Sequence, residues 1–110
     1  MFGEDHMLFT LVRTDKPGQA DLRARLQPEH AAYQAPFLPM ITFGGGLVRD
    51  GVDTSGDVDI RDVTGNVLVF EAPDRDTVAA FHANDPYTRE GLFETVIIEQ
   101  LWQRVPEPNA

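Results

Sequence analysis

The alternation of apolar and polar residues predicts strands and helices in a defined order. Strands are expected at residues 6–13, 40–48, 67–72 and 94–102. Residues 58–63 alternate like the first arm of a hairpin that turns at residues 64–66. Both faces of the first strand carry apolar side chains, so both are expected to be covered. The last strand is expected to be long and mostly buried.

Proline positions divide the helical regions. Residues 19–25 carry a partial apolar stripe, and Pro28 is expected to start a second, short helix because proline suits the first helical turn. A further helix is expected to open at residues 73–77, where Asp74 and Asp76 suit a helix N-terminus.

The second strand contains three consecutive glycines at positions 44–46, which indicate a bulge or a close approach of another group to the backbone. The polar residues 49–57 that follow are expected to form a long loop.

The order strand–helix–strand, repeated once, is the split βαβ plan of the ferredoxin-like fold. We therefore expect an α+β protein with a four-stranded antiparallel sheet and helices on one face. Its other face needs cover, because one helical layer does not hide all the apolar strand positions. These positions are Phe9, Phe43, Val69, Ile98 and Trp102. A homodimer with the sheets face to face would cover them.

Composition narrows the class of protein. The 110 residues suffice for one domain, with residues 105–110 as a tail. The chain has no cysteine, which excludes disulfides and cysteine-ligated zinc and fits a cytoplasmic location. The net charge of −9 argues against a nucleic-acid partner, and no apolar run predicts a membrane partner.

Asp85 stands directly before Pro86, in the segment that leads into the last strand. Because proline disfavours the helical region for the preceding residue, Asp85 is expected to be extended or in a turn. Two interpretations remain open. Asp85 could cap a short helix over residues 86–90, or its carboxylate could be fixed at a loop mouth and available to a histidine.

Several motifs, taken in order, resemble the YCII-related (YciI-like) family of the dimeric α+β barrel group. They are Pro28-Glu29-His30, Phe43-Gly44-Gly45-Gly46-Leu47, Thr64-Gly65-Asn66 before residues 67–72, and Asn84-Asp85-Pro86-Tyr87 before Gly91-Leu92-Phe93. The resemblance covers about residues 7–104. It implies a ferredoxin-like subunit, a dimer, and a pocket between sheet and helices. It also implies a catalytic pair of His30 and Asp85, and some members carry out dehydrohalogenation of chlorinated aromatics.

The chain departs from the family pattern in two places. Pro36 and Pro39 interrupt the helix after His30, and the loop at residues 49–57 is richer in Asp and Gly. Both differences would reshape the pocket, so the family's substrates do not carry over.

A joined His–Asp pair has simple chemistry. The carboxylate of Asp85 would fix the tautomer of His30 and stabilise its imidazolium, and the other ring nitrogen would be a general base. This chemistry requires no cofactor and no metal. A metal site from His30, His82 and Asp85 lacks a close-set ligand motif, and His6 and His82 are interpreted as structural. His82 is expected at a helix C-terminus, where the dipole favours a cation.

Other residues are candidates for binding a small-molecule ligand. Arg25 or Arg23 could hold an anionic oxygen, and the backbone amides of Gly44 and Gly45 could do the same. For the arginines, a solvated helix face is the competing interpretation. Tyr87, with Phe43 and Trp102, could line an aromatic pocket or could contribute to the core or a dimer contact.

Three classes of function follow from these candidates. The first is a lyase or isomerase without a cofactor, with His30 as the base, Asp85 orienting it, and a small aromatic or dicarbonyl molecule as substrate. The second is a module that binds small molecules in the same pocket without turnover. A cofactor-free oxygenase is the third. The first two differ in whether His30 and Asp85 lie within hydrogen-bond reach beside an open cavity.

Overall fold

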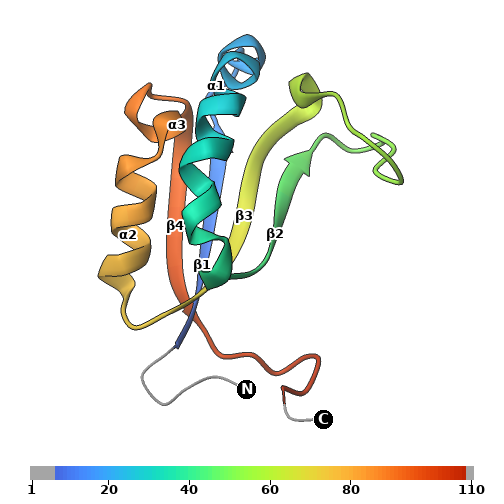
Figure 1. Ribbon diagram of the computed structural model, residues 1–110. Helices are drawn as coiled ribbons and strands as arrows, with labels where there is room; N and C mark the ends of the chain where they lie inside the picture. The colour runs from blue at the N-terminus through green and yellow to red at the C-terminus, as the bar shows by residue number, and fades with distance from the viewer. Residues whose placement is uncertain (1–6, 109–110) are drawn as a thin grey trace.

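The apolar strand segments pair into one antiparallel sheet with the strand order β2-β3-β1-β4 (Figure 1). The protein is seen in a computed structural model, which describes residues 7–108. Its strands are β1 (Met7–Asp15), β2 (Ile41–Val48), β3 (Val63–Ala72) and β4 (Phe93–Leu101). This strand order and the helical connections confirm the predicted ferredoxin-like fold.

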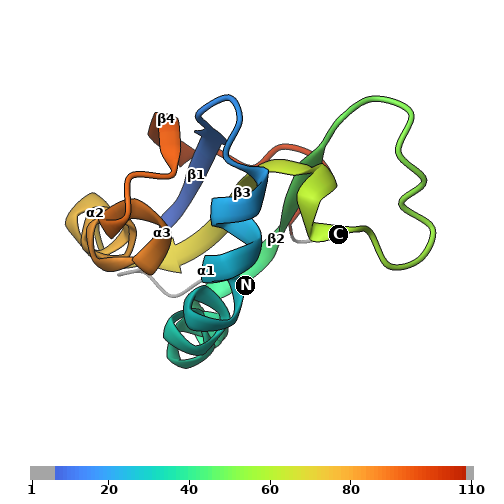
Figure 2. The same ribbon diagram turned by 90° about the horizontal axis from the view of Figure 1, so that it is seen from above.

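The helices α1, α2 and α3 cover one face of the sheet, as the view from above shows (Figure 2). Their bounds are Ala20–Gln34, Arg75–Asn84 and Pro86–Arg89. Two 3-10 segments are also present: η1 (Ala35–Met40) directly precedes β2, and η2 (Ile60–Asp62) directly precedes β3. The predicted helix after residue 73 is confirmed, and Asp74 caps it by accepting a hydrogen bond from the Thr77 amide.

The core lies between the sheet and these helices. Phe9 and Leu11 of β1 pair with Phe70 and Leu68 of β3, so these side chains share the helix-covered face. Phe81 of α2 packs against them, and all five side chains are buried. Helix α2 is therefore held mainly by apolar contact with the middle of the sheet.

The predicted break at Pro28 is wrong, because α1 runs through it without interruption. Arg23, Leu26 and His30 are the buried residues of this helix, and their spacing places them on one face on both sides of Pro28. Packing of this face keeps the chain helical although proline removes one backbone hydrogen bond. The helix then tightens into η1, which contains Pro36 and Pro39.

The predicted hairpin turn at residues 64–66 is also wrong. These residues lie inside β3, and η2 stands where the first arm was expected. The glycine there serves a close strand approach, because a Cβ added to Gly65 would lie 2.2 Å from the Arg13 carbonyl oxygen of β1. A Cβ on Gly44 of β2 would likewise lie 2.6 Å from the Leu68 side chain, which confirms the close approach predicted for the glycine run.

The expectation of a mostly buried last strand is wrong for the single chain. Strand β4 lies at the edge of the sheet, and Ile98 is its one buried residue. Large apolar side chains are exposed on the face away from the helices, among them Phe43 and Ile97. Position 6, where the first strand was expected to begin, lies outside the described residues. In the part of the chain that is described, no helix combines the length and apolar character that a membrane span requires.

Candidate active site

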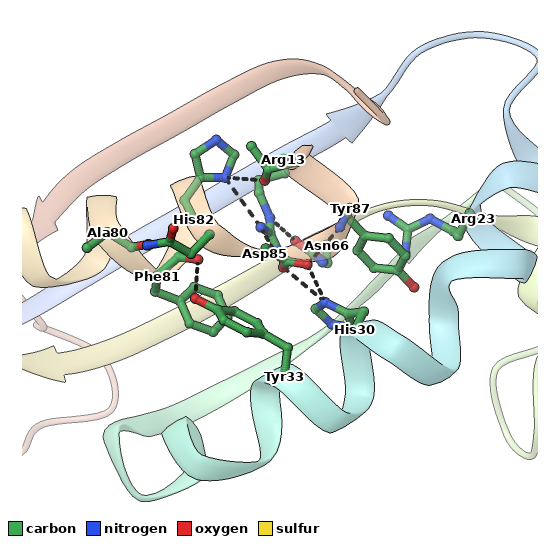
Figure 3. A network of polar contacts seen from close by, with 12 residues as sticks. Arg13, Arg23, His30, Tyr33, Asn66, Ala80, Phe81, His82, Asp85 and Tyr87 are labelled. Atoms are coloured by element: carbon green, nitrogen blue, oxygen red, sulfur yellow. Dashed lines mark hydrogen bonds and ion pairs between the residues drawn. The ribbon is translucent and has the colours of Figure 1, made fainter. Parts of the chain in front are cut away.

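His30 and Asp85 lie 55 positions apart in the sequence, and the fold brings their side chains into contact (Figure 3). The Nδ1 atom of His30 lies 2.9 Å from both Oδ1 and Oδ2 of Asp85. His30 comes from the buried face of α1, and Asp85 precedes α3. Both residues are buried, with Asp85 fully so.

Asp85 caps the short helix, as one interpretation of its sequence context expected, and its carboxylate also contacts a histidine. It is extended, and its Oδ1 accepts a hydrogen bond of 3.0 Å from the Tyr87 amide, which caps α3. The same carboxylate accepts from His30 and forms a 3.0 Å ion pair with Nη1 of Arg13. The side chain of Asp85 thus caps α3 and also holds the imidazole ring of His30.

The carboxylate of Asp85 stays ionised despite its burial. Burial by itself raises the pKa of Asp85, but the hydrogen bond from His30, the charge of Arg13 and the Tyr87 amide outweigh it and hold this pKa below its ordinary value. An ionised carboxylate only accepts hydrogen bonds, so Nδ1 of His30 carries the proton in this contact. Nε2 of His30 is then the nitrogen with a free lone pair.

Arg13 is a site residue that the sequence analysis missed. Its guanidinium is fully buried, donates from Nε to Oδ1 of Asn66 at 3.0 Å, and lies 4.4 Å from the centre of the Phe93 ring. A signal was present in the alternation of the first strand, because Arg13 falls in phase with the apolar positions Phe9 and Leu11. A charged residue on a core-facing position requires a buried partner.

His82 contacts Arg13 at Nη1, the same nitrogen that pairs with Asp85. Its Nδ1 lies 3.3 Å from Nη1 of Arg13 and 3.2 Å from the hydroxyl of Thr88. Burial, and then the charge of Arg13, lower the pKa of His82, although Asp85 opposes this. The cation expected at this helix end is therefore disfavoured, and a neutral His82 accepts hydrogen bonds instead.

A pocket of about 400 Å³ lies beside the pair, between α1 and the strands β2 and β3. Its lining includes His30, Tyr87, Gly44 and Gly45, all of which were predicted site residues. Tyr87 stacks on the His30 ring at a centroid distance of 4.2 Å. The chain therefore places a histidine and an aromatic ring in the lining of one pocket, and the carboxylate that contacts the histidine is fully buried.

The two candidate arginines of α1 differ in their placement. Arg23 lines the pocket, and Asp15 holds it through two contacts of 2.7 and 2.8 Å. Its guanidinium lies 4.7 Å from the centre of the Tyr87 ring. Arg25 is exposed and does not line this pocket. Of the two, Arg23 is the one that the fold places where a ligand could reach it.

Other candidates lie away from the pocket. Phe43 and Trp102 are exposed, and neither belongs to its lining. Among residues 7–108, no group of three or more His, Cys, Asp or Glu side chains is arranged to hold a metal ion.

Comparison with known proteins gives a consistent result. The model of the YCII-related domain matches residues 7–102. The dehydrochlorinase TftG of Burkholderia phenoliruptrix AC1100, which acts on 5-chloro-2-hydroxyhydroquinone and was solved with 2,5-dihydroxybenzoquinone, is 37% identical. The alignment covers 88% of this chain and 94% of that one, with a TM-score of 0.78. No match was found among curated proteins.

More distant structures share the fold alone. A NIPSNAP family protein from Agrobacterium tumefaciens C58 is 18% identical, with a TM-score of 0.53 and coverage of 94% of this chain and 97% of that one. A protein described as an antibiotic biosynthesis monooxygenase from Bacteroides thetaiotaomicron VPI-5482 is 9% identical, with a TM-score of 0.52 and coverage of 94% and 93%. The family match, which spans nearly the whole described chain, is decisive: this protein belongs to the YCII-related family.

Proposed function

We propose that this chain is a lyase that requires no cofactor and eliminates a hydrogen halide from a small hydroxylated ring, with His30 as the general base. The observation that carries the proposal is the contact between Nδ1 of His30 and the ionised Asp85 at the edge of the pocket. This contact leaves Nε2 as the proton acceptor, and Asp85 stabilises the imidazolium that forms.

The reaction balances without an oxidant or reductant. His30 takes the proton of a ring hydroxyl, the oxygen forms a carbonyl, and the neighbouring carbon that carries chlorine is protonated by the imidazolium. His30 then takes a second hydroxyl proton, and the electron pair moves through the ring and expels chloride. The ring loses one proton and one chloride, and the histidine ends protonated, to be reset by solvent.

Three further features support a small, electron-rich ring as the substrate. The pocket volume of about 400 Å³ lies at the small end of ligand sites. Tyr87 and Arg23 add a planar ring and a planar guanidinium to the pocket lining, which suits a flat molecule. TftG, at 37% identity over most of both chains, is a dehydrochlorinase of a chlorinated hydroquinone.

The test is chloride release from 5-chloro-2-hydroxyhydroquinone by the purified protein and by His30→Ala. Loss of general base catalysis should reduce the rate by about 10²–10⁴-fold. The thermal melt should stay cooperative at a lower temperature, because the ionised Asp85 loses a buried hydrogen-bond partner. Arg25→Gln is the matched control, because Arg25 lies on the same helix, is exposed and does not line the pocket. If His30→Ala and the wild type release chloride equally fast, His30 is not the base. Ligand binding without turnover by the wild type would favour a binding module.

We also infer that two subunits pair through the sheet face that the helices leave open. Phe43 is 71% exposed and Ile97 is 51% exposed on that face, and such apolar area on a small domain is usually covered by a partner. The two strands that carry them lie at opposite edges of the sheet, so a partner would span the whole face.

A further inference from the structure

Asn66 is a buried polar residue of the pocket lining that has no role in the reaction proposed above. It lies on β3 directly opposite Arg13 of β1, on the face that the helices cover. Only 7% of the residue is exposed, and it lines the pocket together with His30 and Tyr87. The sequence predicted a turn at Asn66, and in a turn its side chain would not face Arg13 across the sheet.

The contact with Arg13 determines which way the Asn66 amide points. The Nε–H group of Arg13 can only donate a hydrogen bond, so the atom that faces it at 3.0 Å must be the side-chain carbonyl oxygen of Asn66. The amide nitrogen Nδ2 is therefore turned away from Arg13. Within residues 7–108, no hydrogen bond from Nδ2 to the protein is seen, and Nδ2 is not among the buried polar atoms that lack a partner. Nδ2 is therefore accessible, and an acceptor oxygen in the pocket that Asn66 lines could take its hydrogen bond.

We propose that Nδ2 of Asn66 donates a hydrogen bond to the substrate oxygen that becomes negative when His30 removes its proton. This inference rests on the proposed function and adds the group that binds the developing charge. Arg13 is the positioning residue of the arrangement. It binds Asp85 at 3.0 Å and Asn66 at 3.0 Å, so one guanidinium sets both the base and the donor.

The ligand selected by this arrangement is a ring with an ionised or ionisable oxygen. A donor that approaches a phenolate or enolate oxygen strengthens as the charge grows, whereas it gains little from a neutral ring without oxygen. The pocket should therefore bind 2,5-dihydroxybenzoquinone, whose acidic hydroxyls make it an anion near neutral pH, more tightly than unsubstituted benzoquinone.

The test is titration calorimetry of 2,5-dihydroxybenzoquinone with the wild type and with Asn66→Asp. The carboxylate of the variant keeps an acceptor for Arg13, so a merely structural Asn66 would tolerate the change. A ligand-binding Asn66 would not, because the variant replaces the donor with a negative charge. We expect the Kd to rise by about tenfold to a hundredfold, with the thermal melt retained. Thr64→Ala, an exposed change two positions away on β3, is the control.

The outcomes separate the two proposals. Equal affinity of wild type and Asn66→Asp for the quinone overturns the role of Asn66 and leaves the proposed lyase untouched. Weaker binding by the variant, with no chloride release by the wild type, supports the role of Asn66 and overturns the lyase. A wild type that binds no quinone overturns both. Asn66→Ala adds a second check: kcat should fall more than KM rises if the donor acts chiefly in the transition state.

Discussion

Replacing Asp85 with Asn changes one atom of the site, yet no orientation of the new amide fits it. Every group that contacts the carboxylate is a donor: Nδ1 of His30, Nη1 of Arg13 and the Tyr87 amide. An asparagine NH2 on one side faces Arg13, and on the other side it faces the Tyr87 N–H. In addition, His30 can accept from the amide by moving its own proton to Nε2, which removes the base.

The size of the effect follows from burial. Arg13 and Asp85 are both fully buried, and breaking such a pair by removing one charge costs about 3–5 kcal/mol. A domain of this size has roughly 5–15 kcal/mol of stability in total. At roughly 4–8 °C per kcal/mol, the melting temperature should fall by more than about 10 °C. Turnover should fall by about 10²–10⁴-fold, because the wrong tautomer predominates.

Thermal melts and chloride release of Asp85→Asn measure the two effects separately. The matched variant is the double replacement Arg13→Met with Asp85→Leu, which removes both charges. Apolar side chains of similar size often replace a buried pair at no net cost, so the double variant should be more stable than either single one and still inactive. An Asp85→Asn protein that melts within about 2 °C of the wild type would refute the buried-charge argument. Unchanged turnover would refute the role in orienting His30.

Two further results are expected. Because the folded pKa of Asp85 lies below its ordinary value, the ionised group stabilises the fold above about pH 3.9 and this contribution is lost as the pH falls toward the folded pKa. Urea unfolding should therefore show the stability gap between wild type and Asp85→Asn shrinking from about pH 5 to pH 3, and a constant gap would contradict the shift. Ile97→Asp, which places a charge on the open sheet face, should convert a dimer to a monomer in analytical ultracentrifugation while the melt of the subunit remains cooperative. A wild-type monomer at micromolar concentration would contradict the pairing of sheets.

The fold was predictable because its signals are local. The alternation of β1, the apolar run of β3 and the charge at the start of α2 each indicate an element, and their order indicates the topology. The helix break predicted at Pro28 is wrong because proline usually interrupts a helix, whereas here the buried residues Leu26 and His30 on either side of it keep the chain helical. Gly65 misled in the same way, since a glycine that permits close strand approach cannot be distinguished by sequence from one that permits a turn.

The site was predictable only in part. The His30–Asp85 pair came from resemblance, because 55 intervening residues leave no spacing from which to infer contact. Arg13 and Asn66 pair across β1 and β3, and this pairing depends on strand register, which the mistaken turn at residues 64–66 concealed. Arg23 rather than Arg25 reaches the pocket because helix rotation, set by burial of Leu26 and His30, decides which of the two faces inward.

The narrow gap at Gly65 has a consequence for how this protein can diversify. Gly65 immediately precedes Asn66, and no side chain fits between it and the carbonyl of Arg13. A shift of one position between the two strands would turn Arg13 and Asn66 to opposite faces of the sheet. Gly65 thus fixes the register between β1 and β3. Substitutions around the pocket can change which ligand fits, whereas relatives that use Arg13 and Asn66 in this way must keep the same register.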